Sequence, residues 1–183
     1  MLKRLKDRLR AWLNGTPRNY NAGRNVVSVP NPLYVASLRS FIDQGETVQF
    51  PVRGWSMRCF VEHERDKAVL KACDRETLKR GDVVLTRIDT PDDSEVYVLH
   101  RIIATDGERL TLMGDGNLRG TETCSRRDVV AIVTGFVRKG HSKADLVTGW
   151  KWRTYSALWV PLRPVRRWLL LGWRIKERIV HRK

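Results

Sequence analysis

The sequence predicts a mainly β domain, and three of its features support this prediction. Short apolar segments recur through the middle of the chain and are separated by turn residues. Val48, Phe50 and Val52 occupy alternate positions, which is the period of a half-buried strand. Asp106-Gly107, the commonest signal for a two-residue hairpin turn, separates two further apolar segments. Several short strands joined by turns indicate a fold built mostly from β-strands.

The expected elements follow in order along the chain. Residues 1–13 have apolar residues on one stripe at helical spacing, which predicts a basic amphipathic helix, and the Asn-, Gly- and Pro-rich residues 14–31 are expected to be a linker. A short helix is predicted from Pro32 to Gln44, where a glycine ends it. Strands are expected near 48–52, 67–71, 82–88, 96–104, 109–113 and 128–137, before a polar segment at 138–149. The domain is therefore expected at 32–140, followed by a Trp- and Arg-rich tail at 141–183.

The hairpin turn also predicts a register for its two strands. If Thr105 pairs with Glu108, then His100 and Asp115 lie on one face of the sheet as diagonal neighbours. Such neighbours are separated by about 7–8 Å between backbones, which a histidine and a carboxylate can span. The register therefore predicts a His–carboxylate contact within one hairpin.

A serine upstream of the hairpin completes a candidate catalytic set. Ser56 follows a predicted strand, and a serine hydroxyl becomes a useful nucleophile when a base such as His100, with an ordinary pKa of about 6.5, takes its proton. Asp115 would fix the tautomer of the imidazole and stabilise the imidazolium. Gly54 permits a sharp turn that leaves the Ser56 amide free as an oxyanion donor. Each segment alone is more typical of a turn or a structural strand, and it is their order and the hairpin geometry that favour a catalytic site.

These segments resemble the motifs of signal peptidases of the S26 family, within the wider S24/S26 group that includes LexA-type self-cleaving repressors. The G-x-S-M motif with the nucleophile is matched by Gly54-Trp55-Ser56-Met57, and the G-D-V-V strand start by Gly81-Asp82-Val83-Val84. The H-R-I/V segment of the histidine (endoplasmic-reticulum and archaeal) type is matched by His100-Arg101-Ile102. The G-D-x-N segment is matched by Gly114-Asp115-Gly116-Asn117, and the closing G-x-V strand by Gly135-Phe136-Val137. The resemblance covers about residues 48–140.

The resemblance implies a fold and an activity. The fold would be the coiled antiparallel β-fold of signal peptidases and LexA-like peptidase domains. The activity would be that of a serine endopeptidase that cuts a signal-peptide-like or leader precursor after small residues. Ser56 would be the nucleophile, His100 the general base and Asp115 the orienting acid. Candidate oxyanion or cleft support comes from Gly54, Met57, Arg101 and Asn117.

The chain departs from the family pattern at two places. Cys59 stands where the family usually has the proline of S-M-x-P. The histidine type often has a second acidic residue shortly after G-D-x-N, and here Glu122 is the one residue that could take that place. The departures concern the shape of the cleft and the acidic support of the histidine.

The charge of the chain is concentrated at its two ends. The formal net charge is +15, of which residues 1–18 contribute +5, residues 150–183 contribute +9 and residues 19–149 contribute +1. Six of the seven tryptophans also lie in the two end segments. Pro164 is expected to open a helix with Val165, Trp168, Leu169 and Ile179 on one side. Basic helices with Trp/Leu faces are typical of the membrane interface, so both tails are predicted to bind a surface of anionic lipid; docking of these stripes on the core is the alternative.

Several other classes of protein are disfavoured. No apolar run approaches the ~18–20 residues of a membrane span, and charges interrupt the N-terminal segment, so we expect a cytoplasmic protein, peripheral to the inner membrane. Cys59, Cys73 and Cys124 are odd in number and lack C-x-x-C spacing, and the histidines do not cluster, so neither disulfides, a metal nor a cofactor is expected.

Two rival functions remain from the sequence. One is a catalytically silent, membrane-tethered module that binds peptides without cutting them. The other is a repressor-like protein that binds nucleic acid through its basic ends. The second is disfavoured because residues 19–149 are almost neutral and contain no recognisable helix-turn-helix.

Overall fold

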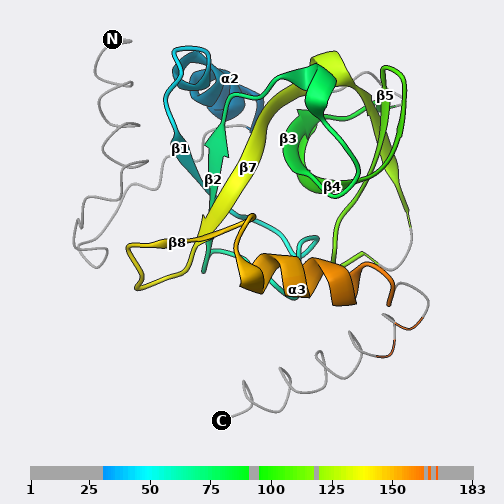
Figure 1. Ribbon diagram of the computed structural model, residues 1–183. Coiled ribbons are helices and arrows are strands. Elements are labelled where there is room, and N and C mark those ends of the chain that lie inside the picture. Colours follow the sequence, from blue (N-terminus) through cyan, green and yellow to red (C-terminus); the bar gives the residue numbers. More distant parts are fainter. Residues whose placement is uncertain (1–30, 91–94, 118–119, 163–164, 166–167, 169–183) are drawn as a thin grey trace.

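The fold is mainly β, as the sequence predicts. The computed structural model describes residues 31–90, 95–117, 120–162, 165 and 168. Within them, one antiparallel sheet curls into a half-barrel, and two α-helices lie at opposite ends of it (Figure 1). The predicted helix at 1–13, the linker at 14–31 and most of the helix predicted from Pro164 lie outside the described residues.

The strand order places β7, from the C-terminal half of the chain, between β2 and β3. The order is β1-β2-β7-β3-β4-β5-β6, and β8 also pairs with β7. The strands are β1 (Val48–Pro51), β2 (Lys67–Lys71), β3 (Val83–Arg87), β4 (Tyr97–Asp106), β5 (Arg109–Met113), β6 (Glu122–Ser125), β7 (Val129–Val137) and β8 (Ala144–Leu146). The α-helices are α2 (Asn31–Ile42) and α3 (Trp150–Trp159), and the short 3-10 helices are η1 (Arg75–Thr77) and η2 (Arg126–Asp128).

The core has two parts that follow the sheet. One part lies between α2, β1, β2 and β7 and includes Leu38, Leu70 and Phe136, none of which is exposed. The other lies between β3, β4 and β5 and includes Val84, Ile102 and Leu112. These apolar residues alternate with more exposed ones in β2, as expected for a strand with one face on the core.

Two strands were missing from the sequence prediction because their sequences carry little strand signal. β6 is a short, largely polar strand paired with β5. β8 has only three residues and lies in the predicted polar segment at 138–149, where it pairs with the end of β7. A side chain at Gly135 would come within 3.3 Å of the Ala144 Cβ, so the glycine allows β8 to approach. Both strands form through tertiary pairing and not through local propensity.

The predicted register of the central hairpin is wrong. Asp106 pairs with Arg109, so the two loop residues are Gly107 and Glu108, and the register then shifts between Ile102 and Ala104. The extra residue at this bulge moves the rest of β4 by one position relative to β5. A shift of one residue changes which side chains share a face, so the partners expected for His100 and Asp115 change as well.

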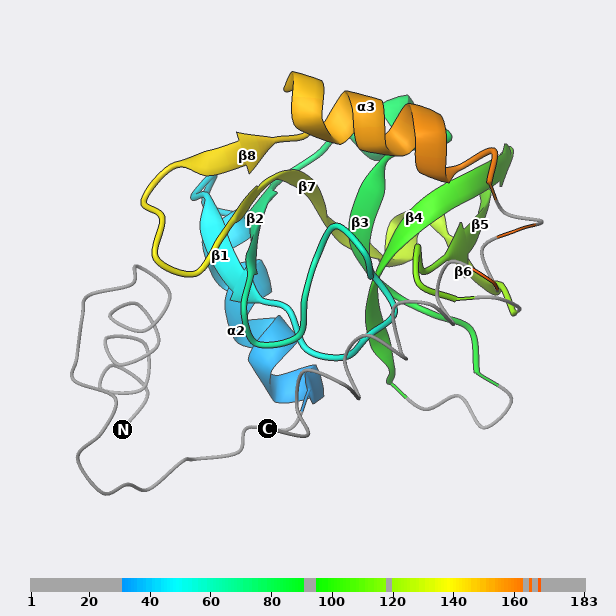
Figure 2. The same ribbon diagram turned by 90° about the horizontal axis from the view of Figure 1, so that it is seen from below.

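Helix α3 extends the fold beyond the predicted domain end at residue 140. It crosses the lower edge of the sheet, as two perpendicular views show (Figures 1 and 2). Trp152 is 5% exposed and belongs to the core, with its ring 4.9 Å from that of Phe60 and 5.0 Å from that of Phe136. The inward residues Trp152, Tyr155 and Trp159 recur at helical spacing, a signal present in the sequence.

In the part of the chain that the structure describes, no helix combines the length and the apolar character needed to cross a bilayer.

Candidate catalytic site

The turn that carries Ser56 is held by contacts on both sides of the serine. Gly54 has φ +90°, and its N–H donates to Nδ1 of His63 at 2.9 Å. The Trp55 ring lies 4.9 Å from the His63 ring, and the Arg58 guanidinium lies 3.5 Å from the centre of the Trp55 ring. Ser56 itself is half-buried, so part of the residue is open to solvent.

The residue after the serine fixes the other side of this turn. Met57 is 2% exposed and packs in the core, which anchors the chain directly after Ser56. The predicted cleft residues Gly54 and Met57 therefore act by shaping and anchoring the turn.

The segment from Gly114 to Gly116 runs directly against the serine. The N–H of Gly116 donates to the carbonyl oxygen of Ser56 at 2.6 Å. A Cβ at Gly114 would lie 2.5 Å from that oxygen, 2.9 Å from the Ser56 Cβ and 3.0 Å from Nε2 of His100. Only glycine leaves the space that the serine and the histidine share.

His100 contacts a carboxylate, and its ring lies near the serine across Gly114. It is 4% exposed on β4, and its Nδ1 lies 3.1 Å from Oε2 of Glu122 on β6. Its Nε2 and the Ser56 Cβ both lie within 3.0 Å of the position that a Gly114 Cβ would take. A carboxylate at Nδ1 favours the tautomer with its proton on that nitrogen, which leaves the Nε2 lone pair toward the serine.

The charge state of Glu122 suits this arrangement. The hydrogen bond with His100 is the main cause that lowers the pKa of the Glu122 carboxyl, and the electrostatic interaction with His100 adds to it, while burial opposes it. Glu122 is therefore ionised at neutral pH and accepts a hydrogen bond from the Nδ1–H of His100.

Asp115 occupies a different place from the predicted one. It is 2% exposed, and its two carboxylate oxygens accept from Nε and Nη2 of Arg101 at 2.8 and 2.7 Å. The carboxylate at Nδ1 of His100 is that of Glu122, so the prediction that Asp115 orients the histidine is corrected. The physical reason is the bulge in β4, because the shift of register alters which side chains face Asp115.

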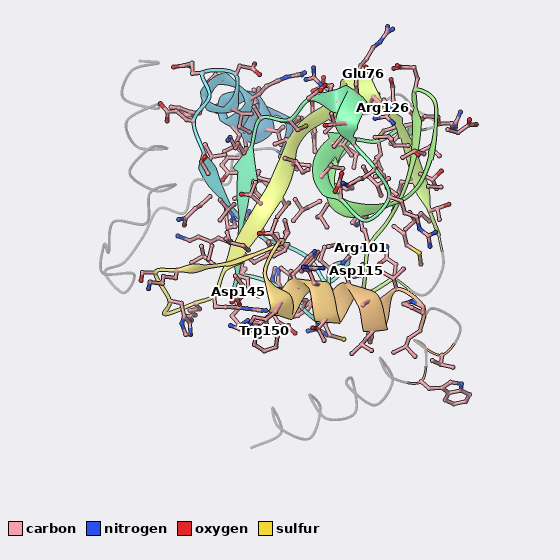
Figure 3. The ribbon with its side chains drawn as sticks, viewed as in Figure 1. Glu76, Arg101, Asp115, Arg126, Asp145 and Trp150 are labelled. Carbon is pink, nitrogen blue, oxygen red and sulfur yellow. The ribbon has the colours of Figure 1, made fainter. Side chains whose placement is uncertain are left out.

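Helix α3 completes the surroundings of the Arg101–Asp115 pair. The Tyr155 hydroxyl donates to Oδ2 of Asp115 at 3.2 Å, and Nε1 of Trp159 donates to its carbonyl oxygen at 2.8 Å. Arg101 Nη1 donates to Oγ of Ser156 at 3.1 Å and to the carbonyl of Gly81 at 3.2 Å. Figure 3 shows Arg101 and Asp115 between the sheet and α3. The predicted support residue Arg101 thus belongs to a buried, hydrogen-bonded ion pair, the arrangement that a buried charge requires.

One candidate donor for an oxyanion, the Ser56 amide, lies at the same turn. Among the residues that the structure describes, the Ser56 amide donates to no acceptor and can point to a substrate carbonyl oxygen. The fourth predicted support residue, Asn117, donates its N–H to the carbonyl of Gly114 at 3.0 Å and so closes the turn beside the serine. In the same described ranges, no three His, Cys, Asp or Glu side chains are gathered as a metal site.

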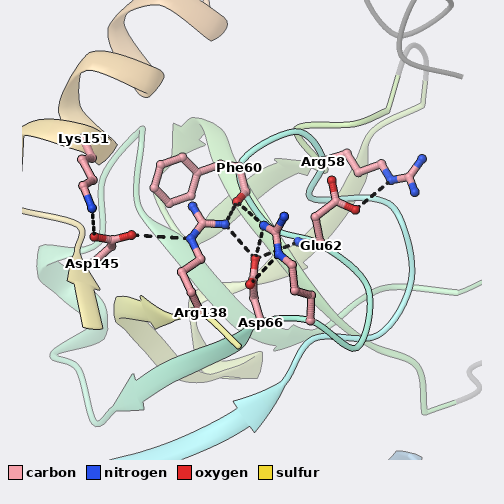
Figure 4. A network of polar contacts seen from close by, with 8 residues as sticks. Arg58, Phe60, Glu62, Asp66, Arg138, Asp145 and Lys151 are labelled. Atoms are coloured by element: carbon pink, nitrogen blue, oxygen red, sulfur yellow. Dashed lines mark hydrogen bonds and ion pairs between the residues drawn. The ribbon is translucent and has the colours of Figure 1, made fainter. Parts of the chain in front are cut away.

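A second ion-pair network supports the loop that follows the serine (Figure 4). Asp66 is 1% exposed and accepts from Arg65 at 2.7 Å and from Arg138, the residue after β7, at 2.8 Å. Arg138 also donates to the carbonyl of Phe60. Asp145 on β8 accepts from Lys151 on α3 at 2.7 Å, which is the main cause that lowers the pKa of its carboxyl. The network therefore connects the loop at 58–66 with β7, β8 and α3.

Comparison with known proteins identifies no family. No family model, curated protein or solved structure matches the chain. The motifs remain a resemblance, and the function is inferred from the geometry of the described residues.

Proposed function

We propose that this protein is a serine endopeptidase in which Ser56 is the nucleophile, His100 the general base and Glu122 the acid that orients the histidine. The observation that carries the proposal is the contact set around Gly114. Nε2 of His100 and Cβ of Ser56 both lie within 3.0 Å of the position that a Gly114 Cβ would take, and Glu122 lies 3.1 Å from the other ring nitrogen. A serine, an oriented histidine and a carboxylate in this order form an activated nucleophile.

The chemistry follows from these positions. Oγ of Ser56 attacks the substrate carbonyl carbon while its proton passes to Nε2 of His100. Glu122 accepts a hydrogen bond from the Nδ1–H, which stays on the ring, and stabilises the imidazolium, while the Ser56 amide donates to the oxyanion. His100 then gives its proton to the leaving amine, and the acyl-enzyme is hydrolysed by water that His100 deprotonates. No group beyond the chain and water is needed to balance these steps.

The substrate class is proposed from the motif resemblance. The family acts on signal or leader peptides with small residues before the cut, so a precursor peptide with such residues is the first substrate to test. A peptide library that is digested and read by mass spectrometry would give the cleavage preference directly.

Labelling with a serine-reactive phosphonate probe tests the proposal. We expect the wild-type chain to be labelled, and Ser56→Ala and His100→Ala to lose labelling by at least about 10³-fold, because the hydroxyl is a weak nucleophile without its base. Ser142→Ala, which removes an exposed hydroxyl between β7 and β8, is the matched control and should be labelled as wild type.

Labelling that persists in folded Ser56→Ala or His100→Ala would contradict the proposal. If the folded wild type is not labelled and cuts no peptide of the library, the protein binds peptides without cleaving them, and the arrangement is a scaffold.

A further inference from the structure

Helix α3 has two faces, and only one of them is occupied by the domain. Trp152, Tyr155 and Trp159 point inward, where Tyr155 and Trp159 bind Asp115. With 3.6 residues per turn, Trp150, which is 75% exposed, lies on the opposite side of the helix, and Leu158, which is 63% exposed, lies at the edge of that side. Figure 3 shows Trp150 on the side of α3 away from Arg101 and Asp115. We call this side the outer face; it comprises Trp150, Thr154 and Ala157, with Leu158 at its edge.

Exposed apolar side chains gather on and around this outer face. Of the nine large hydrophobic residues that are exposed in the described part of the chain, six lie between residues 146 and 168: Leu146, Trp150, Leu158, Leu162, Val165 and Trp168. Single exposed hydrophobic residues are common on protein surfaces, whereas a concentration in one segment marks a binding surface.

Both charged residues of α3 are basic, and one of them, Lys151, pairs with Asp145. Lys151 and Arg153 are exposed at its two sides, and the sequence from 146 to 176 contains no Asp or Glu. Beyond residue 162, the remaining chain adds eight Lys/Arg and one Glu. A second copy of the chain would bring these like charges together, so self-association through this face is disfavoured.

We propose that the outer face of α3 docks on the surface of an anionic lipid bilayer. Tryptophan prefers the interface because its ring is apolar and its N–H is polar, and leucine adds apolar area that enters the acyl boundary. Each basic residue near the surface is attracted by anionic headgroups. The outer face lies within the predicted tail at 141–183 and before the helix predicted from Pro164, so the proposal assigns lipid binding to α3 within that tail.

Docking in this orientation would set the position of the candidate catalytic site. The inner face of the same helix contacts Asp115 and Arg101, and a helix is about 10–12 Å across. The hairpin that carries His100 would therefore lie about one helix diameter from the bilayer. The docking itself does not depend on the proposed peptidase activity.

Vesicle co-sedimentation of the full chain tests the proposal. The vesicles are phosphatidylcholine alone and phosphatidylcholine with phosphatidylglycerol, and the variant is Trp150→Ser with Leu158→Ser. We expect wild type to bind the anionic vesicles, and the double variant to bind them about tenfold more weakly or less, because the apolar area that enters the boundary is lost. Leu33→Ser on α2 is the matched control, since Leu33 is also 63% exposed, and it should bind as wild type. Arg153→Glu should weaken binding to the anionic vesicles only.

Circular dichroism confirms that each variant is folded before its binding is compared. Equal binding by the double variant and wild type, an equal loss in Leu33→Ser, or no binding of wild type to anionic vesicles would overturn the proposal. A dimer in sedimentation that dissociates in the double variant would also overturn it, because the occupant of the outer face would then be a second copy.

Discussion

Two neighbouring residues of β4, His100 and Arg101, each pair with a carboxylate, and the two pairs differ in burial and in partners. The Arg101 and Asp115 side chains are both 3% exposed and make two short hydrogen bonds to each other, with α3 packed over them. The Glu122 side chain that binds His100 is 27% exposed and makes a single contact at 3.1 Å. The first pair holds the hairpin to α3, while the second leaves one imidazole nitrogen directed to Ser56. Consecutive strand residues point to opposite faces, so one strand supplies a structural pair and a chemical pair.

Glu122→Gln removes the carboxylate of the His100–Glu122 pair and should have the largest effect on activity. A neutral amide can stabilise the wrong histidine tautomer and cannot stabilise the imidazolium, so we expect probe labelling and peptide cleavage to fall by about 10³–10⁴-fold. The free energy of unfolding should change by less than about 1 kcal/mol, since the contact is partly exposed. Labelling kinetics and urea denaturation on the same sample measure both quantities. Full activity in Glu122→Gln would contradict the role of Glu122 as the residue that orients His100.

Asp115→Asn should break the structural pair instead. It leaves the Arg101 guanidinium buried without its counter-ion, so we expect the free energy of unfolding to fall by about 3–5 kcal/mol in urea denaturation. Asp145→Asn is the control, because the Asp145–Lys151 pair is more exposed, and it should cost about 0–1 kcal/mol. Similar losses in the two variants would show that burial does not distinguish these pairs.

Much of this comparison could be predicted from the sequence, but its central assignment could not. The alternating residues of β1 and the Asp106-Gly107 turn indicated the sheet, and the order of the three motifs indicated Ser56 and His100 as residues that lie together. The bulge between Ile102 and Ala104 has no local signature, because an extra strand residue is stabilised only by its partner strand.

The carboxylate that contacts His100 is Glu122 and not the predicted Asp115, for the same reason. Asp115 was assigned from an unbulged register, while Glu122 reaches His100 only because the polar strand β6 pairs at the sheet edge. The aromatic spacing in α3 was present in the sequence, but that these residues pack on Asp115 depends on tertiary contacts.

Gly114→Ala tests how closely His100 and Ser56 pack around Gly114. The new methyl group would meet the Ser56 carbonyl at 2.5 Å and must displace the serine turn or His100. We expect labelling to fall about 10²-fold, because small displacements of reacting groups have effects of this size. Gly140→Ala is the control: Gly140 has φ +82° with no atom near its Cβ position, so stability should fall by about 1 kcal/mol and labelling should stay unchanged. Wild-type labelling in Gly114→Ala would contradict the close packing.

The smallest expected effect is on the pH dependence of stability. The pKa of Glu122 is lowered in the folded state, chiefly by its hydrogen bond with His100, so the unfolded state binds the proton more tightly. The stabilising contribution is therefore present above the ordinary carboxyl pKa and is lost as the pH falls through the lower, folded value. Urea denaturation from neutral to acidic pH should show a shallower loss for Glu122→Gln than for wild type. Identical slopes would mean that the pair contributes nothing to stability.

The most direct test of the account is the NMR spectrum of the His100 ring in ¹⁵N-labelled wild type, Glu122→Gln and Asp115→Asn. We predict a neutral ring protonated at Nδ1 in wild type, with a downfield Nδ1 proton that is lost or strongly shifted in Glu122→Gln and retained in folded Asp115→Asn. A ring that responds to Asp115→Asn and ignores Glu122→Gln would contradict the assignment of Glu122 as the carboxylate that orients the catalytic histidine.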